Sequence, residues 1–242
     1  MKKFLTVALA GVLAASMLFT GCSKKAESKV PDKLIVGTNA EFPPFEYMND
    51  KKQPEGFDIA MIKEIGKRMG KKVEIKNMEF KSLIGAMESD SINAIIAGMT
   101  KTEKREKAVD FSDSYYTTNQ AIILKKDSKI TKLAQLDGKK IGVQEGTTGD
   151  LISSGDKFGD GKKAKVLVKG AKVKRFKKGV DAVMDLKNGS VDAVVIDELT
   201  ANEFVKKNAK KLKIVIDSAG SEYYCIALTK GNTCLLYTSP SP

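Results

Sequence analysis

The chain has 242 residues, of which 42% are hydrophobic and 30% are charged. This length and composition are sufficient for one large domain or for two lobes with hydrophobic cores, and they exclude a chain that is disordered throughout. Lysine and arginine outnumber the acidic residues by 42 to 30, and the resulting charge of +12 could attract nucleic acid or anionic lipid. No stretch interleaves these cations with exposed aromatic residues, as proteins that bind single strands do, so we expect no nucleic-acid partner.

The N-terminus predicts export from the cell. Two lysines precede an apolar stretch, residues 4–19, that is too short for a comfortable membrane span and is typical of a signal peptide. The letters LFTGC that follow resemble a bacterial lipobox, and this resemblance implies that residues 1–21 are removed and that Cys22 carries lipid. The alternative is an ordinary signal peptide with a chance cysteine. With residues 22–32 as a polar tether, we expect a lipid anchor on the outer face of the cell membrane, or in the periplasm.

Strands and amphipathic helices alternate after the tether. Residues 33–38 (KLIVGT) form the apolar run of a buried strand, and residues 58–69 place their apolar side chains on one helical stripe that Gly70 ends. The segments KVEIKNM, SLIGAMES and INAIIAG continue as a strand, a helix opened by Ser82 and a strand. This alternation predicts a mostly parallel sheet covered by helices.

The pattern then restarts in a second α/β unit over residues 122–217. Strands are predicted in QAIILKK, KKIGVQ, VDAVVID and LKIVID, and helices from Thr147, in VDAVMDLKNG as far as Gly189, and in ELTANEFVKKN. Residues 218–233 contain a further strand that could return to the first unit, residues 33–121. The prediction is therefore two lobes joined by two crossings, with a ligand cleft between them that can close.

The cysteines do not form a disulfide framework. Cys225 lies in an apolar, strand-like run and is predicted to be a small buried hydrophobe. Cys234 opens residues 234–242, CLLYTSPSP, which resemble the translation of a transposon-end adapter used in sequencing libraries. We therefore expect the natural sequence to depart near Thr233 and to continue with one or two helices. The chain has no histidine and no Cys/His ligand set, so we expect neither a metal nor a cofactor.

Five segments together resemble a known family. VGTNAEFPPFEY, GFDIAMIKEIGKRMG, AGMTKTEKREKAVDFSDSYY, GVQEGTTGD and VDAVVIDELTANEF are similar, in order and spacing, to the amino-acid-binding proteins of polar amino-acid ABC importers, bacterial solute-binding protein family 3. The resemblance runs from about Leu34 to Thr233. It implies an α/β, two-lobed type II periplasmic-binding-protein fold with two hinge crossings. It also implies a monomer that binds a polar L-amino acid without catalysis and presents it to ABC permease subunits.

The same resemblance assigns the residues that hold the amino acid's carboxylate. Arg105 takes the family's carboxylate-binding position, where a planar guanidinium can hold two oxygens and lysine offers only a point charge. Thr100 would add a hydroxyl and an N–H, and the first N–H groups of the helix at Thr147 and Thr148 would face the anion. The alternatives are a surface cation at Arg105 and a plain helix cap at Thr147.

The remaining predicted contacts surround the ammonium and the side chain of the ligand. Asp197 takes the ammonium position, unless it only caps the next helix, and Gly98 would offer its carbonyl. Phe42 and Phe80 match positions whose rings sandwich the ligand side chain, although each could instead belong to the core. Asn39 replaces an aspartate found in several relatives and weakens an assignment to lysine or arginine. Glu41, Gln120 and Gln144 could add polarity but have no predicted place.

Two other functions remain open on sequence alone. A few dehydratases resemble these binding proteins, but such an enzyme would require a general acid or base in the cleft, and only carboxylates or a perturbed lysine are present. A lipoprotein that senses a ligand without transporting it cannot be separated from an importer subunit by sequence.

Overall fold

The computed structural model describes residues 31–155, 168–216, 221–232 and 235. The predicted signal peptide, the predicted lipidation site Cys22 and Cys234 lie outside these residues. Residues 236–242 of the predicted adapter-derived tail also lie outside the described residues. Leu235 is described, and it packs in the hydrophobic core beside the first sheet. Within the described parts of the chain, no helix is long and apolar enough to cross a bilayer.

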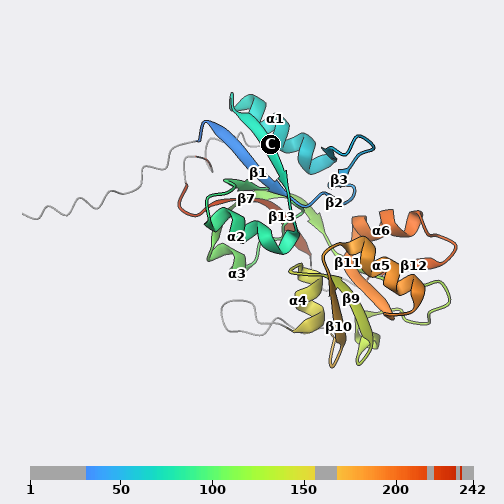
Figure 1. Ribbon diagram of the computed structural model, residues 1–242. Coiled ribbons are helices and arrows are strands. Elements are labelled where there is room, and N and C mark those ends of the chain that lie inside the picture. The colour runs from blue at the N-terminus through green and yellow to red at the C-terminus, as the bar shows by residue number, and fades with distance from the viewer. Residues whose placement is uncertain (1–30, 156–167, 217–220, 233–234, 236–242) are drawn as a thin grey trace, which may run out of the picture.

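Two five-stranded sheets form the two lobes visible in Figure 1. The first sheet has the order β5-β1-β6-β13-β7 and the second the order β10-β9-β11-β8-β12. The strands of the first sheet are β1 (Lys33–Thr38), β5 (Lys72–Asn77), β6 (Ala94–Ile95), β7 (Val109–Thr118) and β13 (Glu222–Thr229). Those of the second are β8 (Gln120–Lys125), β9 (Lys140–Gln144), β10 (Lys172–Phe176), β11 (Ala193–Asp197) and β12 (Leu212–Ile216). A small third sheet joins β2 (Glu41–Phe42), β3 (Glu46–Met48) and β4 (Pro54–Glu55).

Helices accompany both large sheets. The first lobe contains α1, α2 and α3 and the second α4, α5 and α6 (Figure 1). Their bounds are α1 (Phe57–Arg68), α2 (Leu83–Glu88), α3 (Glu103–Glu106), α4 (Thr148–Ser154), α5 (Gly179–Asn188) and α6 (Glu198–Lys206), with short 3-10 turns η1 (Phe80–Ser82) and η2 (Leu133–Leu136). The predicted ends of α1 and α5 hold, because Gly70 and Gly189 both adopt the left-handed conformation that follows a helix terminus.

The prediction of a mostly parallel sheet is confirmed, because four of the five strands in each large sheet run in the same direction and only β13 in the first sheet and β8 in the second are reversed. In the first sheet β1 pairs in parallel with β5 and β6, whereas β13 runs antiparallel to β6 and β7. The second sheet repeats this arrangement, with β8 antiparallel to β11 and β12. The reversed strand of each sheet, β8 or β13, is the first strand after a crossing from the other lobe.

The chain crosses twice between the lobes, once on each side of the second sheet's sequence. The first crossing takes a single residue, Asn119, between β7 and β8. The second lies between β12 and β13, and β13 returns to the first sheet as predicted. Because β13 pairs with β7 so that Glu222 stands opposite Thr118, the two crossings lie side by side.

Two segments differ from their predicted structure. The run after α3 forms the ten-residue strand β7, which the sequence did not predict because its charged and hydroxyl side chains hide the strand periodicity. The predicted strand INAIIAG shortens to the two residues of β6. Cys225 is buried in β13, as expected.

Candidate functional site

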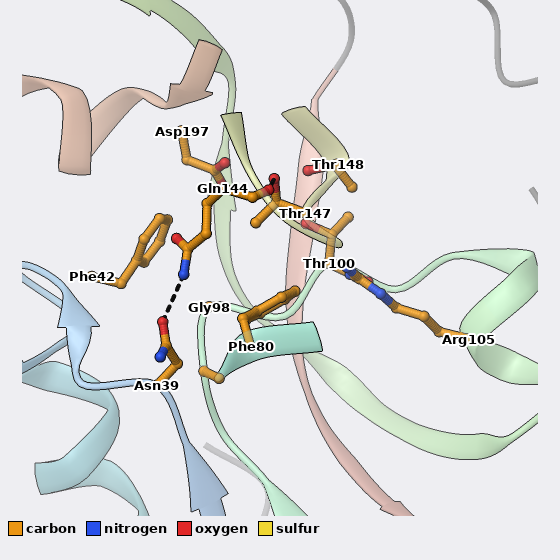
Figure 2. Close-up of a pocket in the computed structure, with 11 residues that line it drawn as sticks. Asn39, Phe42, Phe80, Gly98, Thr100, Arg105, Gln144, Thr147, Thr148 and Asp197 are labelled. Atoms are coloured by element: carbon orange, nitrogen blue, oxygen red, sulfur yellow. Dashed lines mark hydrogen bonds between the residues drawn. The ribbon is translucent and has the colours of Figure 1, made fainter. Parts of the chain in front are cut away.

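One pocket between the lobes contains every predicted ligand-binding residue (Figure 2). The first lobe contributes turns that follow β1 and β6, together with β2, η1 and α3. The second contributes the turn after β9, the start of α4 and the end of β11. Ligand groups in α/β sheets collect at the carboxyl ends of parallel strands, which explains why residues so distant in sequence converge. The residues that line the pocket are Asn39, Phe42, Phe80, Ala97, Gly98, Thr100, Arg105, Gln144, Thr147, Thr148 and Asp197.

Arg105 is a buried cation, so its interpretation as a surface charge is wrong. Its side chain is 6% exposed, and its two terminal nitrogens donate to the carbonyls of Thr100 at 2.5 Å and Gly146 at 3.0 Å. The guanidinium carbon lies 5.3 Å from the centre of the Phe80 ring. Burial lowers the pKa of Arg105 from its usual value to about 10, and the nearby carboxylates of Glu222 and Asp197 oppose this shift. The guanidinium therefore stays charged at neutral pH.

A carboxylate that the sequence did not predict stands beside this cation. Glu222, the first residue of β13, accepts hydrogen bonds from the hydroxyls of Thr100 and Thr148, both at 2.7 Å, and from the amide of Gln120 at 3.0 Å. Thr100 belongs to the first lobe and Thr148 to the second, so the carboxylate bridges the cleft. The only signal in the sequence was an acidic residue at the start of a strand that crosses between lobes.

Asp197 is 5% exposed and ends β11. Its carboxylate accepts hydrogen bonds from Gln120 at 2.7 Å and from the hydroxyl of Tyr224. It occupies the cap position of α6 without a side-chain hydrogen bond to the helix, which argues against a purely capping role. Burial and then the nearby charge of Glu222 raise the pKa of Asp197 to about 7.

Two amide side chains meet across the cleft. Gln144 donates to the side-chain oxygen of Asn39 at 2.8 Å and to the carbonyl of Lys177 at 3.2 Å, as Figure 2 shows for the first contact. Asn39 in turn donates to the carbonyl of Met78 at 2.8 Å. This part of the pocket is therefore polar but uncharged. Glu41 does not line the pocket and instead pairs with Lys178 at 2.6 Å.

The two aromatic residues have different surroundings. Phe42 is 7% exposed and packs against Phe45 and Tyr224, so it belongs to the core as well as to the pocket wall. Phe80 lies beneath the Arg105 guanidinium. Gly98 has a φ of 51°, and an added Cβ would lie 3.0 Å from the ring of Phe42, so only glycine fits this turn.

Thr147 acts as the cap of α4, which was the alternative to a ligand contact. Its hydroxyl accepts from the N–H of Asp150 at 3.3 Å and donates to the carbonyl of Gln144 at 2.8 Å. Its own N–H donates to that same carbonyl at 3.4 Å. The expectation that this N–H faces an anion is therefore wrong, whereas the hydroxyl of Thr148 does point into the pocket and holds a carboxylate.

Among the residues that the structure describes, three ion pairs join the lobes outside the pocket. Lys81 in the first lobe pairs with Glu145 in the second at 2.8 Å. In the other two pairs the lysine belongs to the second lobe and the glutamate to the first. These pairs are Lys177 with Glu79 and Lys178 with Glu41, both at 2.6 Å. Together with the contacts inside the pocket, these pairs describe two lobes that are closed against each other. Among the described residues, no group of three or more His, Cys, Asp or Glu is placed to hold a metal ion.

The sequence and the fold both match known binding proteins. Residues 34–224 match the family of bacterial extracellular solute-binding proteins, family 3. The arginine-binding extracellular protein ArtP of Bacillus subtilis is 35% identical over 224 residues, which cover 92% of this chain and 83% of ArtP. The structure of an ancestral arginine-binding protein bound to arginine is 42% identical, with a TM-score of 0.78, over 87% of this chain and 90% of that one. An ancestral arginine-binding protein bound to glutamine is also 42% identical, with a TM-score of 0.77, over 87% of this chain and 89% of that one.

The pocket lies between two α/β lobes, and the family match covers most of the chain. The pocket is therefore the binding site of a solute-binding protein and not the active site of an enzyme. The chain belongs to the bacterial extracellular solute-binding proteins, family 3.

Proposed function

We propose that this protein is the extracytoplasmic subunit of an ABC transporter and that it binds a free polar L-amino acid between its lobes for uptake through a permease. The observation that carries the proposal is a pocket between the lobes with a buried guanidinium at one side and a buried carboxylate at the other. An amino acid has one group of each charge, and both groups must find partners when the cleft excludes water. Relatives named for arginine binding support the same function.

The contacts suggest a role for each side of the pocket. Arg105 and the hydroxyls of Thr100 and Thr148 would hold the carboxylate, with Thr147 shaping the turn that positions Thr148. Asp197 would hold the ammonium, together with the carbonyl of Gly98. Asn39, Phe42, Phe80 and Gln144 would surround the side chain.

The part of the pocket that would surround the ligand's side chain favours a side chain that donates a hydrogen bond. The oxygen of Asn39 accepts a hydrogen bond from Gln144 and keeps a second lone pair for a ligand donor, and the rings of Phe42 and Phe80 line the same pocket. A carboxamide or a guanidinium supplies both a donor and a flat surface. This agrees with similar structures bound to arginine and to glutamine.

Replacement of Arg105 tests the carboxylate site. Arg105→Ala should leave the ligand carboxylate buried without its partner at a cost of about 3–5 kcal/mol. At about 1.4 kcal/mol per decade, this corresponds to a loss of about two to three orders of magnitude in affinity. Calorimetry with arginine and glutamine measures the change, and Lys104→Ala, an exposed cation one residue away, is the matched control. Unchanged affinity in Arg105→Ala would reject the role.

The envelope location forms a further part of the proposal. Lipid attachment at Cys22 after removal of residues 1–21, with residues 22–32 as a tether, would hold a monomer at the membrane near its permease. Residues 33–119 and 218–233 would form one lobe and residues 120–217 the other, which moves the predicted boundary at residue 121 to the crossing at Asn119, because β8 of the second sheet begins at Gln120. Labelling with a fatty-acid analogue in the native host should mark the wild type and not Cys22→Ser, and equal labelling of both would contradict the anchor.

A further inference from the structure

Glu222 accepts hydrogen bonds from the two hydroxyls that we expect to bind a ligand carboxylate. One of its oxygens accepts hydrogen bonds from both Thr100 and Thr148, and the other accepts from Gln120. These two threonines line the pocket, and the charge of Glu222 acts on the Arg105 guanidinium. The side chain of this protein thus satisfies the same donors that an amino acid would need.

The two carboxylates cannot use these donors at the same time. A threonine hydroxyl has a single hydrogen, and in this structure both hydroxyls give theirs to Glu222. A ligand carboxylate in the same place would also add a further negative charge beside Glu222 and Asp197, with Arg105 as the only cation that lines the pocket among the described residues. Like charges this close in a buried site are strongly unfavourable.

Glu222 also has a route away from the site. It is the first residue of β13, it is only partly buried, and the preceding Ser221 is exposed. Its backbone lies at the paired crossings, opposite Thr118 and close to Asn119. A rotation of its side chain could therefore return the carboxylate to water without a change in the strand.

We propose, on the basis of the proposed amino-acid binding, that Glu222 is an internal competitor that closes the empty cleft by occupying the carboxylate subsite and that the ligand's carboxylate displaces it. Binding then exchanges one carboxylate for another. The apparent affinity is lowered by the fraction of molecules in which Glu222 fills the subsite.

Affinity measurements on Glu222 variants test this proposal. Glu222→Ala should bind arginine or glutamine about tenfold more tightly than the wild type, because the competing occupant is gone. Glu222→Asp keeps the charge but shortens the side chain by one methylene, so it should lose the contacts with both hydroxyls and should tighten binding in the same direction. Glu88→Ala, which removes an exposed carboxylate elsewhere, is the control.

A second measurement concerns the empty protein. Small-angle scattering without ligand should show a larger radius of gyration for Glu222→Ala than for the wild type, because the carboxylate that joins Thr100 to Thr148 is lost. With saturating ligand the two proteins should agree. Thermal unfolding of each variant establishes that it is folded.

The possible results separate the two proposals. Weaker binding by Glu222→Ala would overturn the proposal that Glu222 competes with the ligand and would instead make Glu222 a ligand contact. Unchanged binding by both variants would overturn it too, and so would a Glu222→Asp protein that binds like the wild type, since charge alone would then explain the alanine result. If no amino acid binds to the wild type or to any variant, the proposed function itself fails.

Discussion

At the scale of single residues, the pocket contains ionisable groups whose pKa values are shifted by burial. Arg105 remains charged despite its lowered pKa, whereas the pKa of Asp197 is raised to about 7. The guanidinium end of the pocket is thus insensitive to pH in the neutral range. The aspartate end is sensitive, and ligand affinity should follow its titration.

We predict that affinity for an amino acid falls as the pH decreases below about 7. In the empty protein Asp197 takes up a proton in this range, whereas a bound ammonium requires the carboxylate form, so binding must release that proton. Each pH unit well below this pKa should cost about tenfold in affinity. Calorimetry between pH 5.5 and 8.5 measures this slope. Asp197→Asn should bind weakly and show a flatter profile, and a profile as steep as that of the wild type would contradict the assignment.

A second pair of buried acids lies behind the pocket. Glu46 is fully buried, and its nearest ionisable partner is Asp58, which accepts hydrogen bonds from the N–H of Gly98 and the hydroxyl of Tyr115, both at 2.8 Å. Burial first, and then the charge of Asp58, raise the pKa of Glu46 well above its usual value. Through Asp58, this pair supports the turn at Gly98 in the pocket wall.

We predict that Glu46→Gln stabilises the protein at pH 7.5 and has little effect near pH 4. The folded-state pKa of Glu46 is raised, so its contribution to stability is fully present below the unfolded-state pKa and is lost as the pH rises. A glutamine stays neutral and can donate to Asp58 at any pH. A difference of one between the folded-state and unfolded-state pKa values corresponds to about 1.4 kcal/mol of unfolding free energy. Urea unfolding at both pH values measures the difference, and Glu88→Gln is the exposed control. A loss of stability at pH 7.5 would contradict the prediction.

At the scale of elements, the site depends on where strands end. β1, β6, β9 and β11 all place their carboxyl ends at the cleft. Asn39 and Gly98 follow the ends of β1 and β6, and Gln144 and Asp197 are the last residues of β9 and β11. Oppositely charged side chains on the rims of the two lobes also bring the lobes together outside the pocket. These charges lie in β2, in the turn before η1, in η1 itself and in the turns after β9 and β10.

We predict that the rim ion pairs contribute only modestly to closure. They are exposed, and salt screens such pairs efficiently. The triple variant Glu41→Gln, Glu79→Gln and Glu145→Gln should weaken ligand binding by less than about tenfold at low salt, with no effect at 0.5 M NaCl. Calorimetry at the two salt concentrations measures this, and the wild type should approach the variant as salt increases. A loss as large as that expected for Arg105→Ala would show that the rim, and not the pocket, drives closure.

At the scale of the whole molecule, two lobes and two adjacent crossings make a hinge. Because β13 and β7 pair beside each other at the crossings, the lobes can rotate about one narrow region, and the pocket lies next to it. Glu222 stands at the point where hinge and pocket meet. This position allows one side chain to affect both closure and affinity.

The sequence by itself determined most of the elements and the set of pocket residues. Apolar periodicity located β1, α1, α5 and β13, because local burial imposes a period that can be counted along the chain. Family-like motifs located Arg105, Asp197 and the other predicted contacts, and all nine of those residues line one pocket. Motifs succeed here because residues such as Asn39, Gly98 and Asp197 stand at or just after the end of a strand, which is a local feature.

Only the tertiary structure decided how strands pair and which groups meet. Three contacts join residues far apart in sequence: the antiparallel pairing of β13 with β6, the contact of Gln144 with Asn39 and the pairing of Tyr224 with Asp197. Glu222 meets Thr100 across 122 residues. No local pattern carries such information, because a contact across the hinge depends on the folding of both lobes and on the angle at which they close.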